Sequence, residues 1–192
     1  MSNRPNRFPP IPPEQYTPSQ REAAASLVSG PRGEVRGPFV PLLYSPELLD
    51  RGQKLGEYLR YRSAVPTALR EFAILIAARH WRQPYEWHAH ARLAAEAGVP
   101  GSLINALAAG REPAEITPDQ AVIYRFCKSV HETGRVDDEL FAAAKGLLGE
   151  NGVIDLLGVC GYYAMLAMVL NVARTPVLPA NAQVPQLPAL LK

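Results

Sequence analysis

The sequence predicts an all-α protein, and three features of its pattern support this. Apolar residues recur at three- and four-residue steps along most of the chain. A Ser or Thr followed by Pro and then by Gln or Glu, which is typical of a helix start, occurs three times. No segment shows the clean two-residue alternation of a half-buried strand. With 192 residues, 47% of them apolar, the chain can bury one substantial core. We therefore expect one domain over residues 17–174.

Two proline-rich segments flank this predicted domain. Residues 1–16 contain five prolines and residues 175–192 contain four. Proline removes a backbone donor and breaks both helices and sheet interiors, so we expect two extended arms. Such arms can clasp a neighbouring subunit.

The first half of the domain reads as four helices. Thr17-Pro18-Ser19-Gln20 is a capping-box start for a helix to about residue 29, closed by glycine. A Gly/Pro-rich loop follows. A second helix, about 45–63, has an apolar face predicted to contain Leu48, Leu49, Leu55 and Leu59. The third and fourth helices are predicted over 66–81, as a buried helix, and over 84–97.

The second half continues with helices separated by glycines. They are predicted over about 102–109, 117–133, 137–148 and 151–171, the second starting with another capping box and the third capped by Asp137. The last is apolar nearly all round, with Asp155 as its one charge. Its uncharged run over 156–170 is shorter than the roughly 20 residues a bilayer needs, so we expect burial on every side. Small residues at three-residue steps would let another helix approach closely, and a helix that is apolar all round in a small protein also suggests a subunit interface.

The predicted helix over 84–97 carries the candidate site. Pro84 belongs to its first turn, and Glu86 and His90 lie four residues apart on one face. This face continues through the apolar Leu93 and Ala97, so we expect both polar side chains to point inward. His88 falls on a polar face and is expected to point at water.

Three stretches resemble the carboxymuconolactone decarboxylase family, which also contains the alkyl hydroperoxidase D-type proteins. Arg70-Glu71-Phe72-Ala73-Ile74-Leu75 is similar to the family's R-E-L-x-I-L, and Tyr85-Glu86-Trp87-x-x-His90 to its Y-E-W-x-x-H. Gly161-Tyr162-Tyr163-x-Met165 and Leu170-Asn171 resemble its terminal helix. The match covers about residues 66–172. It implies a compact multi-helix bundle of the family's type, with the arms outside it.

The chain departs from the peroxidase branch of this family. That branch uses C-x-x-C-x-x-x-H, and aligned on His90 its two cysteine positions hold Gln83 and Glu86. Peroxidase chemistry of the family's kind is therefore expected to be absent. Cys127 and Cys160 lie in apolar helical patterns far apart, which suggests reduced thiols and no redox pair.

Resemblance to the decarboxylase branch implies cofactor-free release of CO₂ from a small carboxylated lactone, as in aromatic-compound catabolism. We assign proton transfer to Glu86 and His90, with Glu71, the counterpart of the family's relay glutamate, as orienter or second carboxylate. The predicted substrate-binding residues are Arg79 for a substrate carboxylate, Tyr85 as a hydrogen-bond donor, and Trp87 and Tyr162 as pocket wall.

Structural interpretations of the same residues stay open. Glu86 suits a helix start whatever its function, and His90 suits a satisfied core histidine. Glu71 can pair with Arg70 or Arg79 along its helix, and Arg79 can be a structural cation. Trp87 and Tyr162 can be core. Glu86 and His90 form a metal-like i, i+4 pair, but no third ligand lies in sequence reach, so no metal is expected.

Three classes of function stay open: a lyase, a peroxiredoxin-like oxidoreductase, and a non-catalytic small-molecule-binding oligomer. A net charge of +2, from 20 basic and 18 acidic side chains, gives no footprint for nucleic acid. The polar N-terminus resembles no signal or anchor, so we expect a cytoplasmic protein without membrane contact. The family resemblance implies a homo-oligomer, a trimer or hexamer, which a monomer in gel filtration would contradict.

Overall fold

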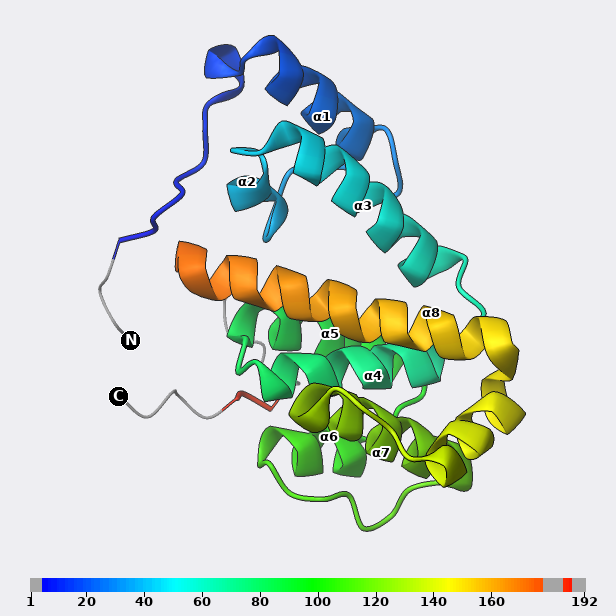
Figure 1. Cartoon of the computed structure of the whole chain (residues 1–192). Coiled ribbons are helices and arrows are strands. Elements are labelled where there is room, and N and C mark those ends of the chain that lie inside the picture. The colour runs from blue at the N-terminus through cyan, green and yellow to red at the C-terminus, as the bar shows by residue number, and fades with distance from the viewer. Residues whose placement is uncertain (1–4, 178–184, 188–192) are drawn as a thin grey trace. The chain divides into compact units, whose positions relative to one another are not determined.

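A computed structural model describes residues 5–177 and 185–187, and every regular element within these ranges is a helix, so the all-α prediction is confirmed (Figure 1). The predicted arms lie partly outside the described residues, at 1–4, 178–184 and 188–192. A short 3₁₀ turn occupies Pro13–Gln15 of the arm expected to be extended. The helices are α1 (Pro18–Val28), α2 (Phe39–Leu42), α3 (Pro46–Tyr61), α4 (Thr67–His80), α5 (Pro84–Glu96), α6 (Gly101–Ala108), α7 (Pro118–Thr133) and α8 (Asp138–Ala173).

The chain divides into two compact units. One comprises residues 1–62 and 166–176, and the other comprises residues 63–165 and 177–192. Every predicted site residue belongs to the second unit. The domain boundaries expected from the sequence, 17–174, stay a prediction.

In the first unit, α1 and α2 each pack against α3. The capping box of α1 forms as predicted, with Thr17 Oγ1 accepting from the Gln20 amide and Gln20 Oε1 accepting from the Thr17 amide. The short helix α2 lies in a stretch predicted to be a loop.

The predicted inner face of α3 is half wrong. Leu49 and Leu59 are buried, whereas Leu48 and Leu55 are 46% and 49% exposed. The buried stripe continues instead through Gly52, Gln53 and Gly56. Residues 49, 52, 56 and 59 recur at helical spacing, and Leu48 and Leu55 each lie one residue, about 100°, away from this stripe. Two of its members are glycines, so a search for apolar side chains overlooks it.

Helix α4 lies at the centre of the second unit, where it contacts α5, α6 and α7 (Figure 1). Every residue from Arg70 to Ala78 is buried, which confirms the predicted buried helix. Arg70 is accommodated because its guanidinium donates to the Val65 carbonyl and to Thr67 Oγ1, each at 3.3 Å. The helix thus carries two charged side chains, Arg70 and Glu71, into the interior.

Both ends of α7 and the start of α8 form as the sequence predicts. A capping box at Thr117 begins α7, and Gly134, with φ +71°, ends it in the left-handed conformation that glycine tolerates. Asp137 Oδ1 then accepts a hydrogen bond from the Leu140 amide at 2.7 Å.

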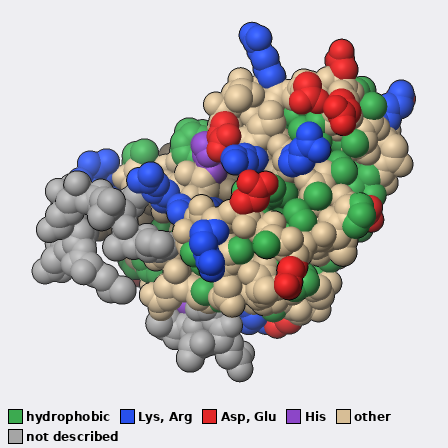
Figure 2. Space-filling model, turned by 90° about the horizontal axis from the view of Figure 1, so that it is seen from below, with side chains coloured by type: hydrophobic (Ala, Val, Ile, Leu, Met, Phe, Trp, Pro, Cys, Tyr) green, Lys and Arg blue, Asp and Glu red, His purple; other side chains and the backbone are tan. Residues whose placement is uncertain are grey.

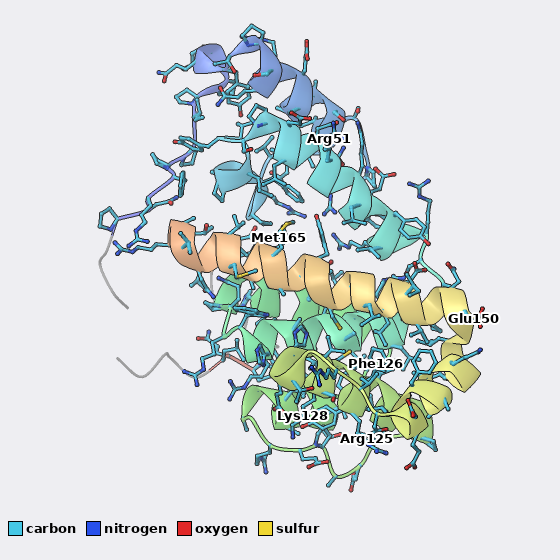
Figure 3. The ribbon with its side chains drawn as sticks, in the orientation of Figure 1. Arg51, Arg125, Phe126, Lys128, Glu150 and Met165 are labelled. Atoms are coloured by element: carbon cyan, nitrogen blue, oxygen red, sulfur yellow. The ribbon has the colours of Figure 1, made fainter. Side chains whose placement is uncertain are left out.

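Gly149 separates two helical segments within α8, at the position where the sequence predicted one helix to end and the next to begin. Gly149 has φ +70° and ψ 175°, a non-helical conformation at which the chain kinks. Glu150, labelled in Figure 3, follows the bend. Beyond it, the buried Asp155 carboxylate accepts from the Ala64 amide at 2.7 Å and so ties α8 to the start of the second unit.

The last half of α8 is not buried on every side, as the sequence had suggested. Ile154 is 65% exposed, and Leu157, Met168 and Val172 are also exposed. One face of this half of α8 is therefore left uncovered in the described structure. The predicted subunit interface stays a prediction. By length and composition alone, α8 could cross a membrane, but the buried core helix of a soluble protein can have the same length and composition. In the most apolar 18-residue segment of α8, 61% is buried.

Candidate active site

The buried carboxylate Glu71 and the buried imidazole His90 meet at the contact between α4 and α5. Glu71 Oε2 lies 2.7 Å from His90 Nδ1, and the two residues are only 3% and 7% exposed. An ionised Glu71 can accept a hydrogen bond from the Nδ1–H group, and Nε2 is then the imidazole nitrogen outside this contact. The role of Glu71 as orienter or second carboxylate stays a prediction.

Glu86 lies one helical turn before His90 and is 3% exposed. Among the described residues, neither of its carboxyl oxygens has a hydrogen-bond partner. The amino end of α5 is capped by Gln83 instead, whose Oε1 accepts from the Tyr85 amide at 2.5 Å. The interpretation of Glu86 as a capping residue therefore finds no contact to support it.

Burial raises the pKa of Glu86 well above its ordinary value. The helix amino end favours the carboxylate by about 0.3–1 kcal/mol. Removing an unpaired carboxylate from water costs several kcal/mol, so desolvation prevails over the dipole. The site therefore combines a carboxyl group whose pKa is raised with a hydrogen-bonded Glu71–His90 pair.

Two tyrosines of α8 stand beside the imidazole. The Tyr163 ring contacts His90 edge-on, with centroids 5.0 Å apart and an interplanar angle of 87°. Tyr162, the predicted wall residue, contacts Tyr163 in the same manner at 5.5 Å. Sequence reasoning had left Tyr163 outside the site. The adjacent tyrosines differ by about 100° around the helix, and only packing decides which of them reaches His90.

Trp87 and Tyr85 occupy other positions on α5. The Trp87 indole is 1% exposed, and its Nε1 donates to the Pro185 carbonyl at 2.6 Å. Trp87 thereby holds part of the C-terminal arm against α5. Tyr85 is half-buried in the first turn of the helix.

The inner face of α5 differs in part from the predicted one. His88 was expected to point at water but is half-buried. The apolar residues that complete the inner face are Ala91 and Ala94, and not the predicted Leu93 and Ala97.

Arg79 does not join the Glu71–His90 pair. It lies eight residues further along α4, about 12 Å along the axis at 1.5 Å per residue. Its Nε donates to the Leu107 carbonyl at 3.1 Å, and its side chain lines a separate cleft. The position of Arg79 therefore does not support the prediction that Arg79 binds a substrate carboxylate beside Glu86 and His90.

The two cysteines are free, as the predicted reduced thiols would be, but they lie side by side although they are far apart in sequence. Cys127 Sγ on α7 lies 3.6 Å from Cys160 Sγ on α8, and both are free and buried. The hydrogen bond with Cys127 and the neighbouring His131 together lower the pKa of Cys160 to about 6, against the effect of burial. The same contact raises the pKa of Cys127. A separation of 33 residues hid this contact, because it depends on how α7 and α8 pack.

Within the described part of the chain, no three His, Cys, Asp or Glu side chains come together in a way that could hold a metal ion. Neither the protein-family models nor the curated proteins compared with this sequence give a match, so the chemistry of the site itself has to carry any conclusion about function.

Proposed function

We propose that this protein is an acid–base enzyme, a cofactor-free lyase of the carboxymuconolactone decarboxylase kind that acts on a small carboxylated lactone. The observation that carries the proposal is the buried Glu71–His90 hydrogen bond one helical turn from the unpartnered Glu86. A buried carboxyl group without a hydrogen bond lowers the stability of the folded protein. Such destabilising groups are often found where a protein needs them for chemistry. The motif resemblance of residues 66–172 supplies the reaction type.

In the proposed reaction, the carbon–carbon bond to the substrate carboxylate breaks and CO₂ leaves. The electron pair of that bond moves into the conjugated lactone, where it forms an enolate-like anion. Glu86, held as the neutral acid, gives its proton to the carbon that lost CO₂. His90, oriented by Glu71, returns a proton to Glu86 from solvent, since the buried carboxylate is the less stable form.

Carboxymuconolactone is the probe substrate for this proposal, with CO₂ release as the measurement. We expect Glu86→Gln and His90→Ala each to lower kcat by about 10²–10⁴-fold, the range of a single acid–base group. Glu71→Gln keeps a hydrogen-bond acceptor and should lower kcat less. His88→Ala, on the same helix and half-buried, is the matched control and should retain wild-type turnover. Equal turnover in wild type, Glu86→Gln and His90→Ala would refute the assignment.

The cysteine pair favours a second candidate function, the reduction of a hydroperoxide. Cys160 as thiolate would attack the terminal peroxide oxygen, so that the O–O bond breaks, an alcohol leaves and a sulfenic acid forms. Cys127 would then attack the Cys160 sulfur and release water, leaving a disulfide that an external dithiol reduces. Both thiols are buried, so a local opening has to admit the peroxide.

This second function predicts dithiol-dependent consumption of tert-butyl hydroperoxide. We expect Cys160→Ser to abolish consumption, because serine is not a nucleophile toward peroxide at neutral pH. Cys127→Ser should instead trap the sulfenic acid, which a dimedone adduct at Cys160 detects by mass spectrometry. Peroxide consumption that persists in Cys160→Ser, or no consumption by the wild type, would eliminate this candidate.

A further inference from the structure

A cleft separate from the candidate active site opens between the end of α4, the loop after α6 and one side of α7. Its volume is about 450 Å³, within the range of small-molecule sites. None of Glu71, Glu86 and His90 lines it. The four cationic side chains that line it are Arg79, Arg82, Arg111 and Lys128.

Among the described residues, none of these four cations forms a salt bridge. Two carboxylates, Glu112 and Glu132, also line the cleft, which leaves a local charge of four minus two, or +2, with the histidines neutral. Lys and Arg side chains lie among acidic ones and a histidine on the face that Figure 2 shows. Lys128, labelled in Figure 3, extends from α7 and also lies 5.9 Å from the Tyr124 ring centroid.

The backbone around the cleft is shaped to hold Arg79 in place. Gly110 has φ +69°, and a Cβ atom at this position would collide with the Arg79 guanidinium. The hydrogen bond from Arg79 Nε to the Leu107 carbonyl fixes the plane of the guanidinium group. A ligand can then contact the two terminal nitrogens of this group. Arg82 adopts φ +50° directly after the C-cap of α4, and the Gln83 amide donates to the Ala78 carbonyl at 2.8 Å, so the left-handed conformation belongs to the end of that helix.

Two histidines form one side of the cleft. The His80 and His131 rings stack with centroids 5.1 Å apart and an interplanar angle of 22°. Burial and the neighbouring His131 lower the pKa of His80. His80 is therefore a neutral hydrogen-bonding group at neutral pH, consistent with a net local charge of +2.

We propose that this cleft binds a small polyanion, a molecule bearing two or more carboxylate or phosphate groups. Two unbalanced positive charges favour a ligand with at least two negative charges over a monoanion, and planar guanidinium groups recognise both kinds of oxyanion in a bidentate manner. The site is distinct from the acid–base centre, and the proposal does not depend on the proposed function.

Isothermal titration calorimetry of the full-length protein tests the proposal with inorganic pyrophosphate and citrate, and with acetate as a monoanion. We expect saturable binding of pyrophosphate or citrate at least tenfold tighter than that of acetate. Tighter binding of pyrophosphate identifies a phosphate site, and tighter binding of citrate a carboxylate site. Arg79→Gln and Lys128→Gln should each weaken binding about 10–100-fold, the loss expected for one charge-assisted contact.

Arg125→Gln is the matched control, because Arg125 is an exposed cation of α7 that does not line the cleft (Figure 3). It should retain the wild-type Kd, as should Glu86→Gln at the other site. Lys128 is exposed, so its variant should fold even if Arg79→Gln does not. No saturable binding of either polyanion at millimolar concentration would overturn the proposal. So would a Kd that is unchanged in Lys128→Gln, or one that rises as much in Arg125→Gln as in Lys128→Gln.

Discussion

Replacing His90 with alanine is expected to lower the free energy of unfolding by about 3–5 kcal/mol, the typical cost of removing one partner from a buried charged pair. Glu71 is 3% exposed and hydrogen-bonded to His90 at 2.7 Å, so the variant leaves its carboxyl group buried without this contact. Removal of the imidazole also leaves a cavity beside the Tyr163 ring. Urea unfolding followed by circular dichroism at pH 7 measures the loss.

A double-mutant cycle separates the lost pair from the lost volume. Glu71→Gln removes the charge but keeps the shape, so the double variant Glu71→Gln/His90→Ala should be more stable than the sum of the single effects implies. His88→Ala, a half-buried histidine of the same helix, should cost about 1 kcal/mol or less. Strict additivity in the cycle would show that Glu71 and His90 do not interact energetically.

Replacing Glu86 with glutamine is expected to stabilise the protein above pH 5 and to flatten its pH dependence. Burial raises the pKa of Glu86 in the folded state above its unfolded value of 4.5. Between these two pKa values the folded state binds one more proton than the unfolded state, so wild-type stability falls as the pH rises through this window. Each pH unit costs the wild type about 1.4 kcal/mol from this group. Glutamine does not ionise and avoids the loss.

Urea unfolding of both proteins at pH 5, 6, 7 and 8 measures this difference directly. The advantage of Glu86→Gln should grow with pH until the folded pKa is reached, and then stay constant. Glu139→Gln is the matched control, since Glu139 also lies in the first turn of its helix but is exposed. Parallel pH profiles for wild type and Glu86→Gln would show that Glu86 is not a buried, neutral acid.

The local features of the fold followed from short stretches of sequence. Both capping boxes, at Thr17 and Thr117, and the helix end at Gly134 form where they were predicted, because each depends on residues within one turn of the chain. The inward direction of Glu86 and His90 likewise followed from their spacing after Pro84. These predictions needed no knowledge of any neighbouring helix.

Predictions that depended on neighbouring helices succeeded less often. The buried stripe of α3 includes Gly52 and Gly56, whose burial reflects close approach and not hydrophobicity. Ile154 of α8 is exposed despite its apolar surroundings. Hydrophobic periodicity identifies a face, but it does not say which side of a nearly uniform helix the rest of the chain covers.

What the sequence determined by itself was the helical class, the helix starts and ends, and a carboxyl group and an imidazole on one face of α5. Only the tertiary structure decided that Glu71 contacts His90 across 19 residues, that Cys127 contacts Cys160 across 33, and that Arg79 belongs to a different cleft. The reason is physical. Spacing along a helix fixes directions around its own axis, whereas contacts between helices depend on the crossing and separation of whole elements, which side-chain packing sets.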